Sequence, residues 1–200
     1  MSKLALRGLI LGTVIALLGV VSYAVAGGGS KNFRGAPMVG YEENPDISTV
    51  ATGEFSARLS DDGDSLEYEL SYSGLEGTVT QAHVHFGKRA INGGVSFFLC
   101  GTAASPGPAG TPVCPGPNSG TVEGEIDAAD VLALITPPPP TAGQGIEAGA
   151  FNEILAAMRY GSTYANVHTT KWPGGEIRAQ IKKGRGGDRD KGDRKKDDDD

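Results

Sequence analysis

The residues of this sequence best suited to chemistry are its three histidines, His83, His85 and His168. A single residue separates His83 from His85 in an apolar stretch, so in a β-strand both side chains point to the same face. A His-x-His pair with a third imidazole can bind Zn²⁺ or Cu²⁺, and one coordination position stays open if no fourth ligand closes it. One interpretation is therefore a mononuclear metal site formed by these three residues.

The surroundings of His168 support a second interpretation, in which the histidines belong to a structural polar network. We expect a hairpin that turns at Trp172, and this register places His168 opposite Glu176. By the same register Asn166 faces Arg178, so one face of the hairpin is polar and the other is apolar. Buried polar groups need partners, and arginine with glutamate makes a charge-assisted pair. Asn166, Glu176 and Arg178 are thus the candidate members of this network.

Motifs of the common catalytic classes are missing from the sequence. It has no Gly-x-Ser-x-Gly elbow, no His-Glu-x-x-His and no phosphate-binding glycine loop. Residues 83–87, His-Val-His-Phe-Gly, resemble the copper-binding strand of copper/zinc superoxide dismutases, but a two-metal dismutase site needs more than three histidines. We therefore expect a non-enzymatic protein, with a metal-dependent redox activity as the remaining alternative. The net charge of −6 argues against nucleic acid as a partner.

The amino-terminal residues have the pattern of a secretory signal peptide. Lys3 and Arg7 precede an apolar run over residues 9–21, and Ala24-Val25-Ala26 is a small-x-small cleavage site. We expect cleavage after residue 26, which leaves no stable membrane span; an uncleaved anchor is the alternative, because the apolar run approaches spanning length. The predicted location is periplasmic or extracellular.

Export makes the two cysteines informative. Cys100 and Cys114 bracket a loop rich in glycine and proline, and in an oxidising compartment we expect them to form a disulfide. A pair of free thiols is the alternative.

The elements that must position these residues are mostly strands. Residues 51–60 and 65–72 alternate between apolar and polar and flank an Asp-Asp-Gly-Asp turn, which predicts a hairpin. Further strands are predicted over 78–86, 95–99 and 120–126, and in the hairpin 163–181.

Two helices are predicted. Asp127 and Asp130 resemble a capping box for a short helix through residue 134, which the prolines of residues 137–140 end before an extended spacer. Residues 146–159 carry apolar side chains at helical spacing and end at Gly161. The expected fold is all-β, an antiparallel β-sandwich-like domain with one or two short helices.

Three separated segments resemble the CHRD (chordin-type) domain. Residues 38–45 are similar to its Gly-x-Glu-Glu-x-Pro opening, residues 82–87 with Asn92-Gly93 to its Ala-His-Ile-His strand and turn, and residues 164–178 to its closing hairpin. The resemblance implies a compact extracellular β-sandwich-like domain without an assigned biochemical activity. The loop between Cys100 and Cys114 and the spacer at 137–140 depart from the family pattern as local insertions.

We divide the chain into a signal peptide (1–26), a flexible lead (27–37), a CHRD-like domain (38–183) and a disordered charged tail (184–200). The tail prediction rests on a run without apolar residues. The sequence predicts a secreted or envelope-located module that binds an extracellular or envelope protein or another ligand. The alternative is a mononuclear Zn²⁺ or Cu²⁺ protein that uses the three histidines.

Overall fold

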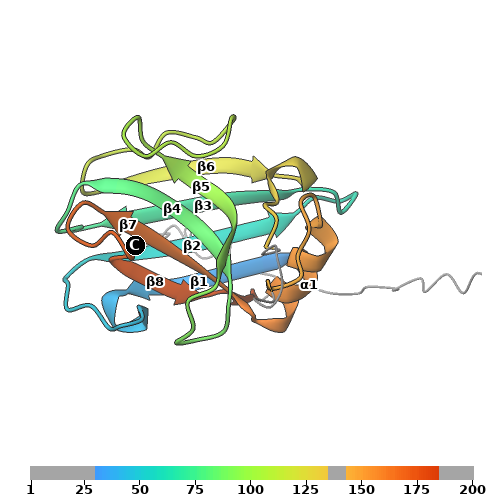
Figure 1. Ribbon diagram of the computed structural model, residues 1–200, viewed down its shortest axis with the longest axis horizontal. Helices are drawn as coiled ribbons and strands as arrows, with labels where there is room; N and C mark the ends of the chain where they lie inside the picture. The colour runs from blue at the N-terminus through green and yellow to red at the C-terminus, as the bar shows by residue number, and fades with distance from the viewer. Residues whose placement is uncertain (1–29, 135–142, 185–200) are drawn as a thin grey trace, which may run out of the picture.

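Nine antiparallel strands make up the fold in the computed structural model, which describes residues 30–134 and 143–184 (Figure 1). The strands are β1 (Asn32–Val39), β2 (Thr52–Leu59), β3 (Leu66–Ser73), β4 (Val79–Phe86), β5 (Gly94–Gly101), β6 (Gly120–Ile126), β7 (Thr163–Thr169), β8 (Ile177–Gln180) and β9 (Lys182–Lys183). Neighbouring strands follow the order β5-β4-β7-β8-β1-β2-β3-β6, and β9 pairs with β1. The predicted signal peptide, the proline spacer and the tail beyond residue 184 lie outside the described residues.

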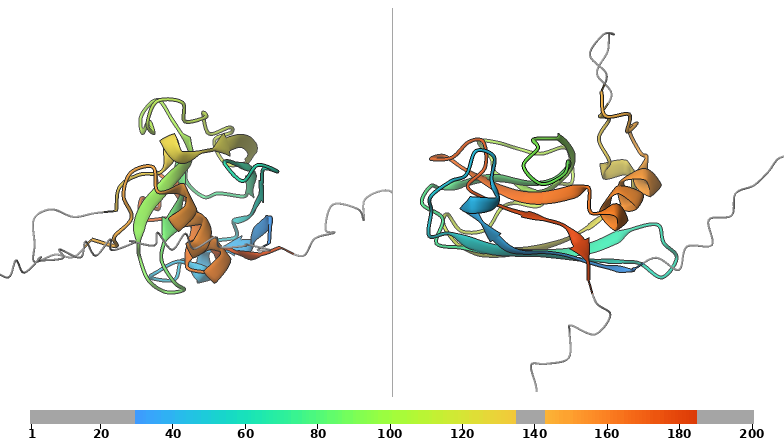
Figure 2. Two further views of the ribbon diagram at one scale, coloured as in Figure 1. Left: turned by 90° about the vertical axis from the view of Figure 1, so that its right-hand side faces the viewer. Right: turned by 90° about the horizontal axis from the view of Figure 1, so that it is seen from below.

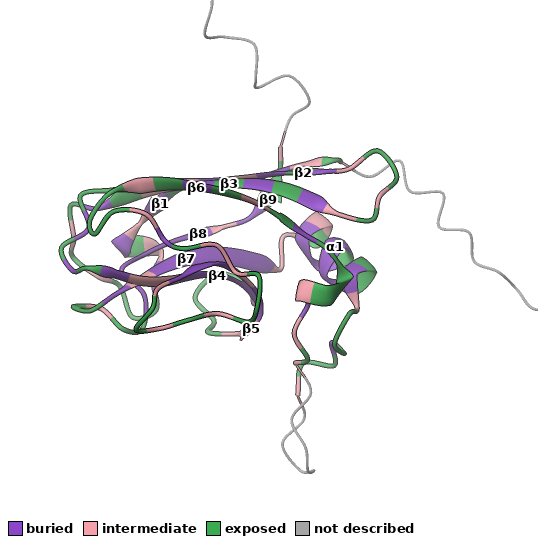
Figure 3. Ribbon diagram, turned by 90° about the horizontal axis from the view of Figure 1, so that it is seen from above, coloured by how far each residue is buried: buried purple, intermediate pink, exposed green. Residues whose placement is uncertain are grey.

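The sheet folds over into two layers. Figure 3 shows β4, β5, β7 and β8 facing β1, β2, β3 and β6. The layers join where β8 pairs with β1 at Arg178 and Val39, and the buried Tyr68 hydroxyl donates across the interior to the Leu99 carbonyl over 2.6 Å. The prediction of an all-β, sandwich-like fold is confirmed. Among the described residues, no helix is long and apolar enough to span a bilayer.

The predicted first hairpin is confirmed as β2 and β3. Its register pairs Leu59 with Leu66 and Phe55 with Leu70, and all four side chains are buried between the layers. Alternate residues of β3 are exposed, which is the pattern of a strand with one wet face.

The predicted flexible lead is wrong in part, because ordered structure begins before residue 38. β1 starts at Asn32, and Phe33 lies in the core at 2% exposure. Arg34 and Glu54 form an ion pair across β1 and β2 at 2.7 Å. The glycine-rich composition concealed this strand, since its stability comes from pairing with β2 and not from its own propensity.

The short helix predicted after Asp127 is also corrected. The capping box is present, but it caps only the 3₁₀ turn η2 (Ala128–Asp130). The Leu132 amide donates to the Ser96 carbonyl at 2.8 Å, and the Leu134 amide donates to the Ile146 carbonyl at 2.7 Å. These long-range hydrogen bonds use the amides that would have continued a helix.

The amphipathic helix is α1 (Phe151–Tyr160), which lies at one end of the two layers (Figure 2). The four side chains that predicted its apolar face are buried: Phe151, Ile154, Leu155 and Met158. It begins five residues later than predicted, because Gly149, inside the predicted range, has a φ of 79°, which a right-handed helix excludes. Gly161 ends it with φ of 72°, as predicted.

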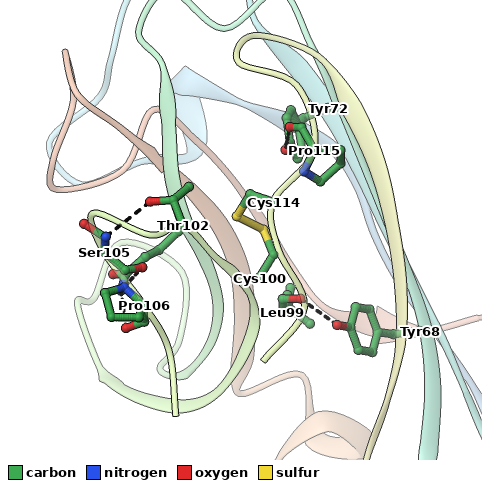
Figure 4. Close-up of a disulfide and its surroundings, with 10 residues drawn as sticks. Tyr68, Tyr72, Leu99, Cys100, Thr102, Ser105, Pro106, Cys114 and Pro115 are labelled. Atoms are coloured by element: carbon green, nitrogen blue, oxygen red, sulfur yellow. Dashed lines mark hydrogen bonds between the residues drawn. A yellow bond between two sulfur atoms is a disulfide. The ribbon is translucent and has the colours of Figure 1, made fainter. Parts of the chain in front are cut away.

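Cys100 and Cys114 form the predicted disulfide (Figure 4). Two tyrosines of β3 hold the backbone on either side of it: Tyr68 donates to the Leu99 carbonyl and Tyr72 to the Pro115 carbonyl. The disulfide therefore closes its loop at the place where the β5 layer meets the β3 layer.

Replacing both cysteines, Cys100→Ala with Cys114→Ala, should lower the free energy of unfolding by about 3 kcal/mol, the value for a loop of this length. The physical reason is that the open chain gains conformational freedom in the unfolded state. Urea denaturation of the double variant and of the wild type, each with and without reductant, measures the loss. Wild-type stability in the double variant would contradict the prediction.

Candidate functional site

The three histidines meet on the outer face of the layer that contains β4, β7 and β8. The register places His83 opposite Asn166 and His85 opposite Tyr164. It also places Asn166 opposite Arg178, as predicted. Polar side chains occupy every position of this face from the middle of β4 to β8: Gln81, His83, His85, Tyr164, Asn166, His168, Arg178 and Gln180.

This polar face is buried, unlike the outer face of β3. β7 is buried along nearly its whole length, which Figure 3 shows as an almost continuous purple ribbon. One cover is the β4–β5 loop (residues 87–93), whose Lys88 and Ile91 carbonyls each accept a hydrogen bond from Arg178 at 3.0 Å. The other cover is the segment after β1 (residues 40–47), which begins with the 3₁₀ turn η1 (Gly40–Glu42).

Polar contacts hold the two covers together. Arg89 forms an ion pair with Glu42 at 2.7 Å. The Asn44 side chain donates to the Ala90 carbonyl, and the Asn92 side chain donates to the Asn44 carbonyl, both at 3.1 Å. The covers thus form one lid over the histidines.

The imidazoles are close enough to share one ion. One nitrogen from each of His83, His85 and His168 lies within 4.8 Å of the others, and His83 Nδ1 is 3.2 Å from His168 Nε2. His83 and His85 are 5% and 8% exposed, whereas His168 is partly exposed and lies nearest to solvent.

Backbone carbonyls determine which nitrogen carries the proton. His85 Nδ1 lies 3.0 Å from the Gly93 carbonyl oxygen, and His168 Nδ1 lies 2.9 Å from that of Pro173. A carbonyl oxygen only accepts, so Nδ1 donates in both rings and Nε2 of each neutral ring is an acceptor. Among the described residues, His83 Nε2 and His85 Nε2 have no hydrogen-bond partner.

Burial keeps the three rings neutral. Desolvation lowers the pKa of His83 to about 2, with further lowering by His168 and His85. It lowers the pKa of His85 to about 4, although the contact with Gly93 opposes the shift. The pKa of His168 is lowered for the same reason. Neutral imidazole is the form that binds a metal ion.

Aromatic contacts fix the orientation of the rings. His85 stacks on Tyr164 with centroids 4.7 Å apart and planes at 2°, and the Arg178 guanidinium carbon lies 3.3 Å from the Tyr164 ring centroid. The Phe98 ring meets His83 edge-on at 4.4 Å. The imidazoles are therefore preorganised by packing.

A buried carboxylate lies beside the cluster. Glu43 is 6% exposed, and burial raises its pKa to about 7, although Arg178, a hydrogen bond from Asn166 and the Asn44 backbone lower it. Neither residue type nor spacing in the sequence marked Glu43, Tyr164 or Phe98 as site residues. Glu43 and Tyr164 do lie in segments that resemble a known family, which is the only pattern that pointed to them.

The predicted position of Glu176 opposite His168, with a charged pair to Arg178, is not what the structure contains. Glu176 is fully buried elsewhere and accepts from the Thr49 and Thr169 hydroxyls, each at 2.8 Å. The amides of Glu76 and Gly77 also donate to it, at 2.7 and 3.4 Å. Glu176 lies one residue before β8, outside the regular pairing of β7 with β8. Its carboxylate therefore points to the opposite side of the hairpin from His168 and connects three loops by hydrogen bonds.

Glu176→Gln should destabilise the fold by about 1–3 kcal/mol, because an amide cannot accept all four donors and leaves some of them unpaired. Thermal or urea denaturation measures this change, with Glu69→Gln, an exposed position on β3, as the matched control. Equal stability of the two variants would show that the hydrogen bonds to Glu176 contribute little.

The neutral histidines predict that the metal-free protein loses stability in acid. A histidine with a lowered folded pKa contributes stability that is present above its unfolded value of 6.5 and lost as the pH falls. The pKa of Glu43 is about 7 in the folded protein and 4.5 ordinarily, so between pH 7 and pH 4.5 its proton uptake raises the free energy of unfolding as the pH falls. His83 and His85 together outweigh it by slightly less than one proton, so the free energy of unfolding should fall by at least about 1 kcal/mol per pH unit from pH ~6 to ~5.

Urea denaturation of chelator-treated protein across this range checks the slope. Glu43→Gln removes the opposing proton uptake and should make the fall steeper. Stability that is level or rises on acidification would contradict the assignment of neutral buried histidines.

The sequence also matches a known protein family. Residues 35–181 match the CHRD domain, a range that includes the strands of the site and both covering segments. Comparisons with curated proteins and with solved structures give no match. Since the match extends over most of the 200 residues and agrees with the three segments that meet around the histidines, the chain belongs to the CHRD domain family.

Proposed function

We propose that this protein is a non-enzymatic, extracytoplasmic binding module whose histidine cluster holds one Zn²⁺ or Cu²⁺ ion. The observation that carries the proposal is the convergence of the three imidazoles in a buried, preorganised cluster, in which the Nε2 atoms of His83 and His85 have no hydrogen-bond partner. His83, His85 and His168 supply borderline nitrogen donors, which suit these two ions.

The surroundings of the ligands support metal binding over a purely structural network. Metal-binding histidines usually donate their other ring nitrogen to a carbonyl or carboxylate, as His85 and His168 do toward Gly93 and Pro173. A hydrogen bond from His83 Nδ1 to His168 Nε2 satisfies part of the metal-free cluster, but the buried Nε2 atoms of His83 and His85 remain unpaired. A bound ion accounts for the unpaired Nε2 atom of His85.

The location of the module is proposed from the family and the disulfide. CHRD domains and disulfides are typical of extracellular proteins, and the proposed signal peptide would direct the chain there. An extracellular or envelope ligand would then meet the domain after export.

Isothermal titration of the chelator-treated protein, purified from the full-length chain, with Zn²⁺ and Cu²⁺ tests the proposal. We expect one ion per chain, with a dissociation constant in the low micromolar range or below. His85→Gln should weaken binding by at least tenfold, because it removes one of three ligands. The exposed Glu69→Gln should bind as the wild type does.

Absence of binding to either ion at low micromolar concentration would overturn the metal proposal. Natively purified protein provides a second measurement, since elemental analysis should find about one equivalent of metal. The polar-network interpretation predicts instead a stable protein that neither ion affects.

A further inference from the structure

Asn166 makes a contact that hydrogen bonding alone does not explain. Its side-chain oxygen lies 3.1 Å from His168 Nε2. Because His168 Nδ1 donates to the Pro173 carbonyl, Nε2 of the neutral ring is an acceptor, and the amide oxygen is an acceptor too. Two acceptors therefore face each other in a buried site.

The orientation of the amide is fixed from its other end. The Asn166 amide nitrogen and the Glu43 carboxylate both lie against Gly175, and a hydrogen bond from Asn166 is among the groups that lower the pKa of Glu43. In its ionised form the Glu43 carboxylate only accepts, so this form holds Nδ2 toward Glu43 and Oδ1 toward the histidines. Turning the amide over would remove this hydrogen bond from a carboxylate that is 6% exposed.

A glycine makes room for this arrangement. A Cβ added at Gly175, whose φ is 125°, would overlap the Glu43 carboxylate and come within 2.9 Å of Asn166 Nδ2. The Trp-Pro-Gly-Gly turn thus leaves space for the Glu43 carboxylate beside the Asn166 amide. The same turn supplies the Pro173 carbonyl that orients His168.

A shared cation resolves the contact between the acceptors. Ligands bound to a tetrahedral ion at about 2.0–2.2 Å are separated from one another by about 3.3–3.6 Å. His168 Nε2 lies 3.1 Å from Asn166 Oδ1 and 3.2 Å from His83 Nδ1, which is close to that spacing. The Asn166 side chain also lies beside His85.

We propose that Asn166 Oδ1 is the fourth ligand of the ion held by the three histidines, and that Glu43 is a positioning residue that holds the amide in place. This inference rests on the proposed function. Three imidazoles and one amide oxygen make a closed four-coordinate set, which suits Zn²⁺ and leaves no position for an exchangeable water. The site then retains a metal ion and does not activate a substrate on it.

Visible absorption of the Co²⁺-loaded protein tests whether the set is closed, with azide as an added ligand. The wild type should show a tetrahedral spectrum that azide leaves unchanged. Asn166→Leu should bind Co²⁺ and Zn²⁺ about 10–100-fold more weakly, and its spectrum should change on addition of azide. Asn166→Asp keeps an oxygen ligand and adds charge, so it should bind at least as tightly as the wild type and stay insensitive to azide.

Two variants of Glu43 separate positioning from ligation. Glu43→Gln retains an oxygen that accepts from Asn166, so the spectrum should stay tetrahedral and insensitive to azide. Glu43→Leu removes the acceptor, so the amide is released and the spectrum should respond to azide as that of Asn166→Leu does. Circular dichroism confirms that each variant is folded.

The outcomes distinguish the two proposals. A wild-type protein that binds no Co²⁺ or Zn²⁺ overturns the proposed function itself. A wild-type protein that binds the metal but also responds to azide has an open position, which overturns the assignment of Asn166 and leaves the three-histidine site standing. Wild-type affinity and azide insensitivity in Asn166→Leu overturn it equally.

Discussion

The constraint on which the rest of the structure depends is the burial of a polar sheet face. In an ordinary two-layer β protein the outer face is solvated, and its side chains need no protein partners. Here residues 40–47 and 87–93 cover the outer face of β4, β7 and β8, so each donor and acceptor on it needs a partner inside the protein. Arg178, which is 1% exposed, donates hydrogen bonds to the Lys88 and Ile91 carbonyls and stacks on the Tyr164 ring.

The chemistry of the histidines follows from this burial. Removal from water keeps the imidazoles neutral, and carbonyls of the lid and of the closing turn decide where the remaining proton sits. Gly93 has room to place its carbonyl against His85 only because it lacks a side chain, since a Cβ there would overlap the Phe86 carbonyl. The loops therefore both shield the histidines from water and determine which ring nitrogen of His85 and His168 carries the proton.

Two buried glutamates show how position changes the role of one residue type. Glu176 accepts four hydrogen bonds from loop hydroxyls and amides and serves the fold. Glu43 retains an oxygen without a partner among the described residues and has a raised pKa, because burial outweighs the groups that favour its charge. The carboxylate with fewer partners is the one beside the histidines.

Local patterns in the sequence determined most of the strands but not β1, and they determined the face of α1 and the side of β4 that both of its histidines share. These features follow from residue periodicity, and the turn at Trp172 was enough to align Asn166 with Arg178. The disulfide followed from the predicted compartment and the cysteine content. The family resemblance marked the three segments that meet around the cluster.

Only the tertiary structure decided which partner each buried polar group takes. The β1 strand before residue 38 depends on its pairing with β2, and the helix expected after Asp130 gives way to hydrogen bonds with Ser96 and Ile146. Glu43, not Glu176, lies near Arg178 because a loop distant in sequence brings it there. Periodicity records which side of a strand a residue occupies, whereas the choice among competing donors and acceptors depends on segments that meet only when the chain has folded.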